Sequence, residues 1–252
     1  MKKSVAEEKM KLNVSTYNIQ HCVDHLHRIR TGEQILVPDK IAAVIKEMGA
    51  DICALNEVYN REMLEGLTDQ SKELAEKLGF FSCFAKAINY RGFEYGNALL
   101  SRYPITKMRS VPIVVPTEKR LKERYEDRVL LISELDIDGT AVTVAVCHFG
   151  LSREEQEIAA DTVIKELSVV NMPLVFMGDL NLTPDSDIIA KLREVFFDTA
   201  LLSEDELLTF SSDAPYMKID YIFTNSHCKP LSAHVPTLVC SDHLPVSAEI
   251  EI

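Results

Sequence analysis

A tight hairpin near the middle of the chain constrains the fold more than any other sequence feature. Two runs rich in β-branched residues, 129–137 and 140–149, flank the dipeptide Asp138-Gly139. Asp-Gly in this setting is a strong signal for a two-residue turn, because both positions tolerate positive φ. Elsewhere, strand-like runs alternate with helical patterns. This mixture predicts an α/β fold with two mixed β-sheets packed face to face and helices outside, and not a single parallel sheet.

Short apolar or alternating runs indicate the other strands. They cover residues 12–19, 51–55, 98–100, 173–177, 219–223 and 244–250. Apolar residues at helical spacing, opened by a capping box or closed by a glycine, indicate the helices. These cover residues 39–48, a segment ending near 78, residues 152–167 and a short stretch after Pro184. A polar, histidine-rich loop is expected after the first strand.

The chain of 252 residues is long enough for one large α/β domain or two small ones. No linker, low-complexity segment or charge block divides it. We therefore expect a single catalytic domain over residues 1–252, with residues 1–11 forming a loose N-terminal extension. Because that extension is charged throughout, it does not have the pattern of a secretory signal.

Composition narrows the functional classes. No apolar run is long enough to span a bilayer, so we expect a cytoplasmic protein without a membrane segment. The six cysteines form no Cys-x-x-Cys pair, and Cys53 and Cys147 lie inside apolar runs. A disulfide framework or a structural zinc site is therefore not expected.

The net charge bears on the substrate. Proteins that grip long nucleic acids normally present a basic face, whereas this chain has a net charge of −12 and a pI near 5.1. The acidic balance disfavours duplex DNA, although a local basic patch would still permit a nucleic acid. The mixed-sign stretch 119–128 is more typical of a solvated loop than of a binding stripe.

A candidate site begins where the apolar run 173–177 ends in Gly178-Asp179-Leu180-Asn181. Alternation along an extended segment places Asp179 and Asn181 on one face. A carboxylate and an amide aimed together suit a water, a metal or a phosphate oxygen. The alternative is that both residues cap the turn before a helix that starts at Pro184.

Other polar residues also stand at the ends of predicted strands. They are Asn18, Glu57, Asn97, His148, Asp220, Asp242 and His243. Each has an ordinary structural explanation, as a cap, a surface acid or a satisfied core histidine. So many strand-end polar residues together indicate a functional site, because strand ends on a rigid scaffold are where loops gather.

An ordered set of motifs carries a family resemblance. The motifs are Thr16-Tyr17-Asn18-Ile19, Leu55-Asn56-Glu57-Val58, the segment 95–102 around Asn97, Cys147-His148-Phe149, Gly178-Asp179-Leu180-Asn181, Ile219-Asp220-Tyr221 and Ser241-Asp242-His243. In this order, and over residues 12–252, they resemble the endonuclease/exonuclease/phosphatase superfamily. The resemblance implies the deoxyribonuclease I-like fold, a four-layer α/β sandwich with the site at one end of two central sheets.

The resemblance also implies the chemistry. Glu57 would be the principal ligand of Mg²⁺ or Mn²⁺, with Asn18 and Asp242 at or near the ion, since magnesium favours sparse oxygen ligation. Asp179 would orient and deprotonate the attacking water. Asn181 would help to position that water or the phosphate.

The remaining roles follow from the same resemblance. Asp220 would hold His243 through a carboxylate–imidazole hydrogen bond, which raises the pKa of the histidine and favours a cation facing the phosphate. His148 would be a second contact to the phosphate or the leaving group. Asn97 would support the site by hydrogen bonding.

A few further residues are candidates for supporting the site or contacting the substrate. Gln20 stands where some DNA-repair endonucleases of the family carry an acid, and His148 stands where they tend to have tyrosine; both differences favour the deoxyribonuclease I, sphingomyelinase and small-phosphatase branches. Glu94 is a candidate for orienting His148, and Arg128 or Arg153 for contacting substrate.

The cluster of His21, His25 and His27 is expected to be a loop of solvated histidines, with His21 within reach of the pocket. These residues lack the regular structure of a dedicated zinc site.

The sequence thus predicts a divalent-metal-dependent phosphoesterase that acts on a small soluble phosphorylated compound, such as a sugar phosphate, without an obligate protein partner. The alternatives are a nuclease acting on DNA or RNA, a sphingomyelinase-like phosphodiesterase and a non-catalytic binding module. The exact substrate, monoester against diester preference, the number of metal ions and the oligomeric state remain open, because specificity in such folds lies in variable loops.

Overall fold

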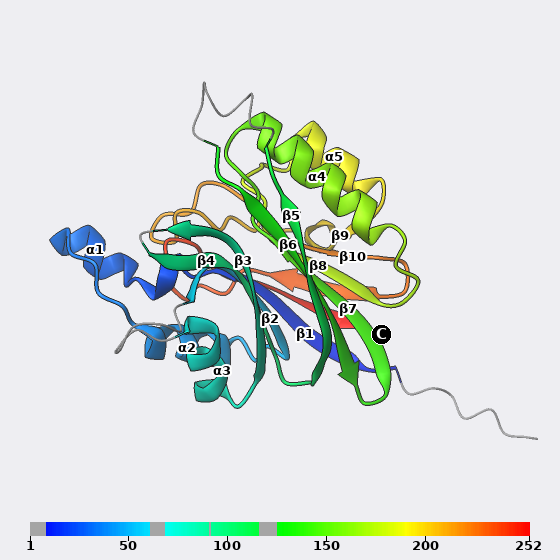
Figure 1. The fold of residues 1–252 in the computed structure, drawn as a ribbon, viewed down its shortest axis with the longest axis horizontal. Coiled ribbons are helices and arrows are strands. Elements are labelled where there is room, and N and C mark those ends of the chain that lie inside the picture. Colours follow the sequence, from blue (N-terminus) through cyan, green and yellow to red (C-terminus); the bar gives the residue numbers. More distant parts are fainter. Residues whose placement is uncertain (1–8, 61–68, 91, 116–124) are drawn as a thin grey trace, which may run out of the picture.

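The computed structural model describes residues 9–60, 69–90, 92–115 and 125–252. Two six-stranded mixed sheets form its centre, with strand orders β11-β12-β1-β2-β4-β3 and β5-β6-β7-β8-β10-β9 (Figure 1). The first sheet contains β1 (Lys11–Asn18), β2 (Ile52–Asn60), β3 (Phe81–Tyr90), β4 (Phe93–Ser101), β11 (Lys229–His234) and β12 (Val246–Glu251). The second contains β5 (Ile105–Ile113), β6 (Arg128–Ile137), β7 (Thr140–Cys147), β8 (Leu174–Asp179), β9 (Phe197–Asp198) and β10 (Asp220–Thr224).

Helices cover the outer faces of both sheets, so the four-layer sandwich expected from the sequence is confirmed. The helices are α1 (His25–Thr31), α2 (Pro38–Glu47), α3 (Gln70–Leu78), α4 (Arg153–Leu167) and α5 (Asp187–Arg193), with short 3₁₀ turns η1 (Gln20–Cys22) and η2 (Thr199–Leu202). Buried residues of α2 and α3 pack with those of β1 and β2, whereas α4 and α5 pack on β7 and β8 (Figure 1). A third apolar cluster fills the space between the sheets.

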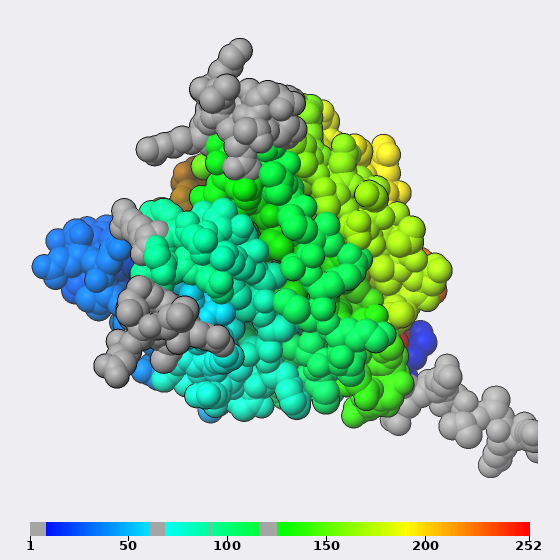
Figure 2. Space-filling view, viewed as in Figure 1, coloured from blue at the N-terminus to red at the C-terminus, as the bar shows by residue number. Residues whose placement is uncertain are grey.

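The alternation of side chains along the strands produces these layers. On β7, Val142, Val144 and Val146 point into the core between the sheets, while Ala145 and Cys147 belong to the cluster under α4 and α5. Both faces of a central strand are therefore buried, which explains why its sequence is a nearly continuous apolar run. The two sheets meet along the face that Figure 2 shows, where the β3–β4 hairpin lies against β5 and β6.

The hairpin and the helix caps have the predicted geometry. Asp138 and Gly139 have φ values of 49° and 90°, as a primed two-residue turn requires. Ser152 and Glu155 form a complete capping box at the start of α4. The short helix expected after Pro184 is present as α5, with Ser186 as its N-cap and Asp187 as its first residue.

Apart from the two-residue strand β9, the strands that the sequence did not predict are β3, β5 and β11. All three are edge strands, and β3 and β5 are exposed or half-buried along most of their length. An edge strand with one solvated face needs little apolar sequence. Its signal is therefore weaker than that of the central strands.

The two chain ends and the histidine-rich segment also differ from expectation. β1 begins at Lys11, and Met10 exchanges backbone hydrogen bonds with Ile252, so residues 10 and 11 are not part of a loose extension; residues 1–8 and most of the stretch 119–128 lie outside the described residues. The expected loop of solvated histidines is wrong, since α1 occupies this segment and His25 is buried against Asp213, with Nε2 and Oδ1 separated by 3.0 Å. Within the described residues, no helix is long and apolar enough to cross a membrane.

Gly178 marks the closest approach between β7 and β8. Its φ is 150°, and a Cβ atom there would lie 1.8 Å from the carbonyl oxygen of Cys147. We predict that Gly178→Ala lowers the free energy of unfolding by about 3 kcal/mol or more, because the backbone of β7 must move. Gly139→Ala is the matched control, with positive φ but no atom within 4 Å of the added Cβ, and should cost only about 1 kcal/mol. Equal losses in urea unfolding would contradict the close-packing argument.

Candidate active site

Polar side chains from both sheets converge at one end of the sandwich. Asn18 ends β1 and Asp179 ends β8, and Asp220 lies opposite Asp179 in the β8–β10 register. Glu57 lies at a bulge of β2, where the register with β4 shifts between Leu55 and Val58. A bulge re-aims a side chain, and the φ of 58° at Glu57 marks this turn. His148, Asn181, Asp242 and His243 follow from the adjoining loops.

A pair of buried amides holds the two sheets together at this end. Asn56 accepts a hydrogen bond at Oδ1 from the backbone N–H of Asp179 at 2.8 Å. Its Nδ2 donates to Asn97 Oδ1 at 2.8 Å and to the carbonyl oxygen of Cys147 at 3.2 Å. Asn97 in turn donates to the carbonyl oxygen of Val129 at 2.9 Å. Asn97 is thus part of this hydrogen-bonded bridge next to the site, and its supporting role stays a prediction. Asn56 was not singled out, although a polar residue just inside the apolar run before Glu57 was the available signal.

Asp179 lies at the centre of the site. Its Oδ2 accepts a hydrogen bond from Asn18 Nδ2 at 3.1 Å and lies 3.5 Å from His148 Nε2 and 3.6 Å from His243 Nε2. Burial raises the pKa of Asp179 to about 7, against the opposing effect of the His243 charge. A carboxylate with a pKa near neutral is suited to accept a proton from a reacting group.

Asn181 lies near His148, but not by simple strand alternation. The chain leaves β8 at Asp179, and Asn181 has a φ of 50°. Asp179 Oδ1 accepts the backbone N–H of Asn181 at 2.9 Å, so the turn is capped. The amide Nδ2 of Asn181 then lies 3.2 Å from His148 Nε2 and donates to the carbonyl oxygen of Phe149 at 3.1 Å. The capped turn and the site are therefore the same structure, and not alternatives.

The predicted pairing of Asp220 with His243 is present, with 2.8 Å between Oδ2 and Nδ1. Burial would lower the pKa of His243, but the negative charges of Asp220 and Asp179 outweigh it and raise the pKa to about 10. His243 is therefore a cation at neutral pH, with Nε2 directed at Asp179.

His148 has the opposite protonation state. Burial and the neighbouring Arg128 guanidinium hold the pKa of His148 well below its usual range, with Arg128 Nη1 3.3 Å from Nδ1. Environments that push the pKa values of two histidines apart separate their roles into a neutral and a charged partner. The expectation that Glu94 orients His148 is wrong: its carboxylate lies 3.3 Å from Lys86 Nζ at a different surface hollow, and Arg128 occupies the position beside His148.

The oxygen-rich group beside Asp179 fits a divalent cation. Burial, and then the charge of Asp242, raise the pKa of Glu57, so a cation between these carboxylates would stabilise both. Gln20 donates from Nε2 to Asp242 Oδ2, and its buried Oε1 has no hydrogen-bond partner among the described residues. Two carboxylates and an amide oxygen are the ligand types that suit Mg²⁺ or Mn²⁺.

Asn18, expected at or near the ion, lies beside Glu57, and its role toward an ion stays a prediction. Its Nδ2 donates to Glu57 Oε1 at 3.2 Å as well as to Asp179, and its Oδ1 accepts the backbone N–H of Gln20 at 3.1 Å. Asn18 thus separates and orients the two carboxylates. Asp179, Asp220 and His243 form a second group of possible ligands, whose ligand atoms all lie within 4.8 Å of one another. In this group, however, His243 Nδ1 is already hydrogen-bonded to Asp220.

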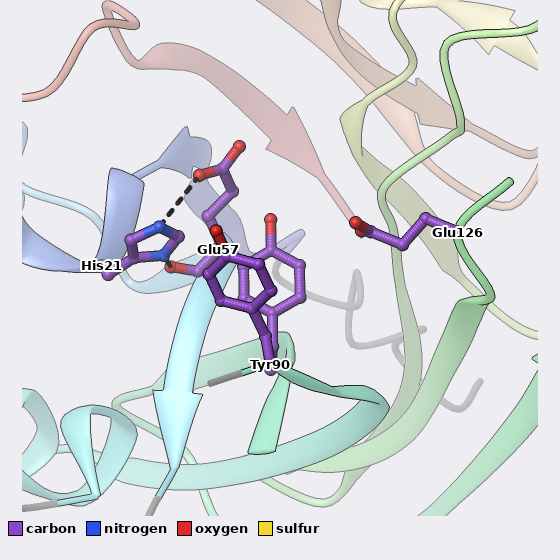
Figure 3. Close-up of a pocket in the computed structure, with 5 residues that line it drawn as sticks. His21, Glu57, Tyr90 and Glu126 are labelled. Atoms are coloured by element: carbon purple, nitrogen blue, oxygen red, sulfur yellow. Dashed lines mark hydrogen bonds and ion pairs between the residues drawn. The ribbon is translucent and has the colours of Figure 1, made fainter. Parts of the chain in front are cut away.

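A pocket opens next to Glu57 (Figure 3). It has a volume of about 190 Å³ and is lined by His21, Glu57, Tyr90, Tyr95 and Glu126. Burial lowers the pKa of His21 to about 4, and its ring stacks on Tyr59 with centroids 4.0 Å apart. His21 therefore reaches the pocket as the sequence allowed. Tyr90, at the end of the edge strand β3, and Glu126, in the loop before β6, were not foreseen. Tyr95 on the inner strand β4 belonged to a motif but was not assigned to the site.

This fold and this arrangement of carboxylates, amides and histidines define a deoxyribonuclease I-like phosphoesterase scaffold. Residues 15–243 match the model of the Endonuclease/Exonuclease/phosphatase family. The chain belongs to this family.

Individual proteins show the same likeness over nearly the whole chain. The uncharacterized protein YbhP of Escherichia coli K12 is 23% identical over 244 residues, which cover 88% of this chain and 90% of YbhP. The crystal structure of an endonuclease/exonuclease/phosphatase from Beutenbergia cavernae has a TM-score of 0.78 and 23% identity, covering 96% of this chain and 72% of that one. The mannosyl-6-phosphatase Bt3783 of Bacteroides thetaiotaomicron has a TM-score of 0.74 and 17% identity, covering 95% and 99%. At these identities the structures show a shared fold.

The charge of His243 provides a direct test of the site electrostatics. We predict that Asp220→Asn lowers the pKa of His243 from its value of about 10, because the substitution removes the adjacent negative charge and leaves the effect of burial. Imidazole NMR signals of the metal-free protein, followed across neutral and alkaline pH, would measure it, with the exposed His234 on β11 as an internal reference. An unchanged titration of His243 would contradict the role of Asp220.

Proposed function

We propose that this protein is a divalent-metal-dependent phosphoesterase that uses an activated water to hydrolyse the phosphate ester of a small soluble phosphorylated compound. The observation that carries the proposal is the placement of Asp179. Its buried carboxylate lies between the cationic His243 and the carboxylate of Glu57, which would bind the metal ion. In this position Asp179 could contact both a water and a phosphate.

Each polar group has a part in the proposed reaction. Asp179 accepts a proton from the attacking water at Oδ2. His243, held by Asp220, directs its Nε2–H and positive charge toward the non-bridging oxygens that gain charge in the transition state. His148 and Asn181 contact the phosphate or the leaving oxygen, and burial together with the Arg128 charge keeps His148 neutral.

Glu57 and Asp242, with Gln20 Oε1, would hold the Mg²⁺ or Mn²⁺ ion. When bound, the ion supplies charge stabilisation to the phosphate oxygens. Asn18 keeps the ion-binding carboxylate of Glu57 apart from the water-activating carboxylate of Asp179, because its amide donates to both.

A sugar phosphate is the preferred substrate class. The net charge of −12 disfavours a long polyanion, and the name of the similar Bacteroides protein, a mannosyl-6-phosphatase, supports a sugar monoester. Activity in the cytoplasm, without an obligate protein partner, belongs to the same proposal. A nuclease remains the second candidate, because nucleases share this chemistry and a local basic groove would serve a nucleic acid.

Removal of divalent metal tests the chemistry and the substrate class together. We predict that EDTA lowers turnover by at least about 100-fold, since metal catalysis of phosphate transfer contributes several kcal/mol, and that excess Mg²⁺ or Mn²⁺ restores it. The panel contains an aryl phosphate monoester, its diester analogue, sugar phosphates and DNA. DNA cleavage at rates far above those of every monoester would favour the nuclease instead.

Substitution of the central carboxylate tests the catalytic assignment. Asp179→Asn and His243→Ala should each lower kcat by about 10²–10⁴-fold, because one removes the proton acceptor and the other the facing cation. Asp185→Asn, on an exposed residue of the loop after β8, is the control and should change kcat by less than about twofold. Unchanged activity in both site variants would exclude this mechanism.

A further inference from the structure

The pocket beside Glu57 has walls from both sheets. Tyr90 ends β3 and Tyr95 lies on β4, both in the first sheet, whereas Glu126 lies two residues before the start of β6 in the second sheet. Figure 3 shows the Glu126 carboxylate facing the tyrosine rings from across the pocket, with the Glu57 carboxylate at its edge. A group held there would therefore lie directly next to the proposed ion-binding carboxylate.

Stacked rings form one wall of this pocket. His21 stacks on Tyr59, and Tyr59 stacks on Phe93 with ring centroids 4.9 Å apart. Tyr95 packs edge-on against this stack and is only 8% exposed, while Tyr90 at its end is 39% exposed. The other rings are buried or half-buried and form the wall, whereas Tyr90 presents a more exposed aromatic face to the pocket. Such a face packs well against the C–H groups of a ring.

Carboxylates supply the polar part of the lining. Glu126 is held by Arg128, with 2.9 Å between Oε1 and Nη1, and its side chain remains 39% exposed. Ionised carboxylates only accept hydrogen bonds, so they suit a ligand that donates from hydroxyl groups. The same negative charges disfavour a second phosphate in the pocket. A cavity of about 190 Å³ is also smaller than the ~300–1,000 Å³ typical of drug-sized ligands.

We propose that this pocket binds an uncharged, hydroxyl-bearing ring of the substrate, and that Tyr90 is the stacking residue that sets the preference for it. The inference rests on the proposed phosphoesterase function and specifies its substrate: one phosphate at Asp179 and Glu57, joined to a single polyol ring between Tyr90 and Glu126. Glu126 accepts hydrogen bonds from the ring hydroxyls opposite the aromatic face.

Tyr90→Leu tests the proposal, with Phe81→Leu as the matched control. Phe81 is an exposed aromatic residue at the opposite end of β3, so both variants remove one ring from the same strand. The measured quantity is the ratio of kcat/KM for a hexose 6-phosphate to that for glycerol phosphate, which has no ring. We expect this ratio to fall by about tenfold, equivalent to ~1.4 kcal/mol, in Tyr90→Leu and by less than about twofold in Phe81→Leu.

A binding measurement separates failure of the pocket from failure of the proposed reaction. Saturation-transfer NMR with a free methyl hexoside should show binding to the wild-type protein and weaker binding to Tyr90→Leu, whether or not any phosphate ester is hydrolysed. The inference would be overturned if Tyr90→Leu lowered kcat/KM equally for the hexose phosphate and glycerol phosphate. It would also be overturned if Tyr90→Leu bound the hexoside as well as the wild-type protein does. A nucleoside monophosphate as the best substrate, with the largest loss in Tyr90→Leu, would overturn it too, since the pocket would then stack a base.

Discussion

The site depends on one buried hydrogen-bonded bridge between the two sheets. The Asn56 amide reaches from β2 to the backbone of β8 and, together with Asn97, to β4, β6 and β7. Apolar packing alone leaves two sheets free to adjust by small slides, whereas buried amides must keep their partners or lose about 1–3 kcal/mol for each unsatisfied group. The bridge therefore fixes the relative position of Glu57, which follows Asn56, and Asp179, whose N–H it binds.

The second constraint is the balance of buried charge. Asp179, Asp220 and His243 are almost fully buried, and isolated ionised groups at such depth would be strongly destabilising. Each is compensated by a neighbour: His243 lies between two carboxylates, and Asn18 donates to Asp179. The same carboxylates raise the pKa of His243, whereas burial and the Arg128 charge lower the pKa of His148. The site therefore holds one charged and one neutral histidine.

The sequence predicted most of the fold because the central strands must be apolar on both faces. The local signals are the continuous apolar runs of the central strands, the Asp138-Gly139 turn and the Ser152–Glu155 capping box. The structure confirms them. The edge strands β3, β5 and β11 were not foreseen, since a strand with one solvated face resembles a polar loop. Helix α1 was mistaken for a loop because its apolar pattern is weak, although Asp24 caps its start and Gly32 ends it; the contact of His25 with Asp213 is visible only in the structure.

The sequence by itself determined which residue types stand at the strand ends, and so the family and the class of chemistry. Strand ends are set by local hydrophobic pattern, which is readable along the chain. Only the tertiary structure decided that Arg128, and not Glu94, lies beside His148, and that Asn18 separates two carboxylates. It also brought Tyr90, at the end of β3, and Glu126, in the loop before β6, to opposite walls of one pocket. Such contacts join distant segments, and their geometry depends on sheet packing that no local pattern encodes.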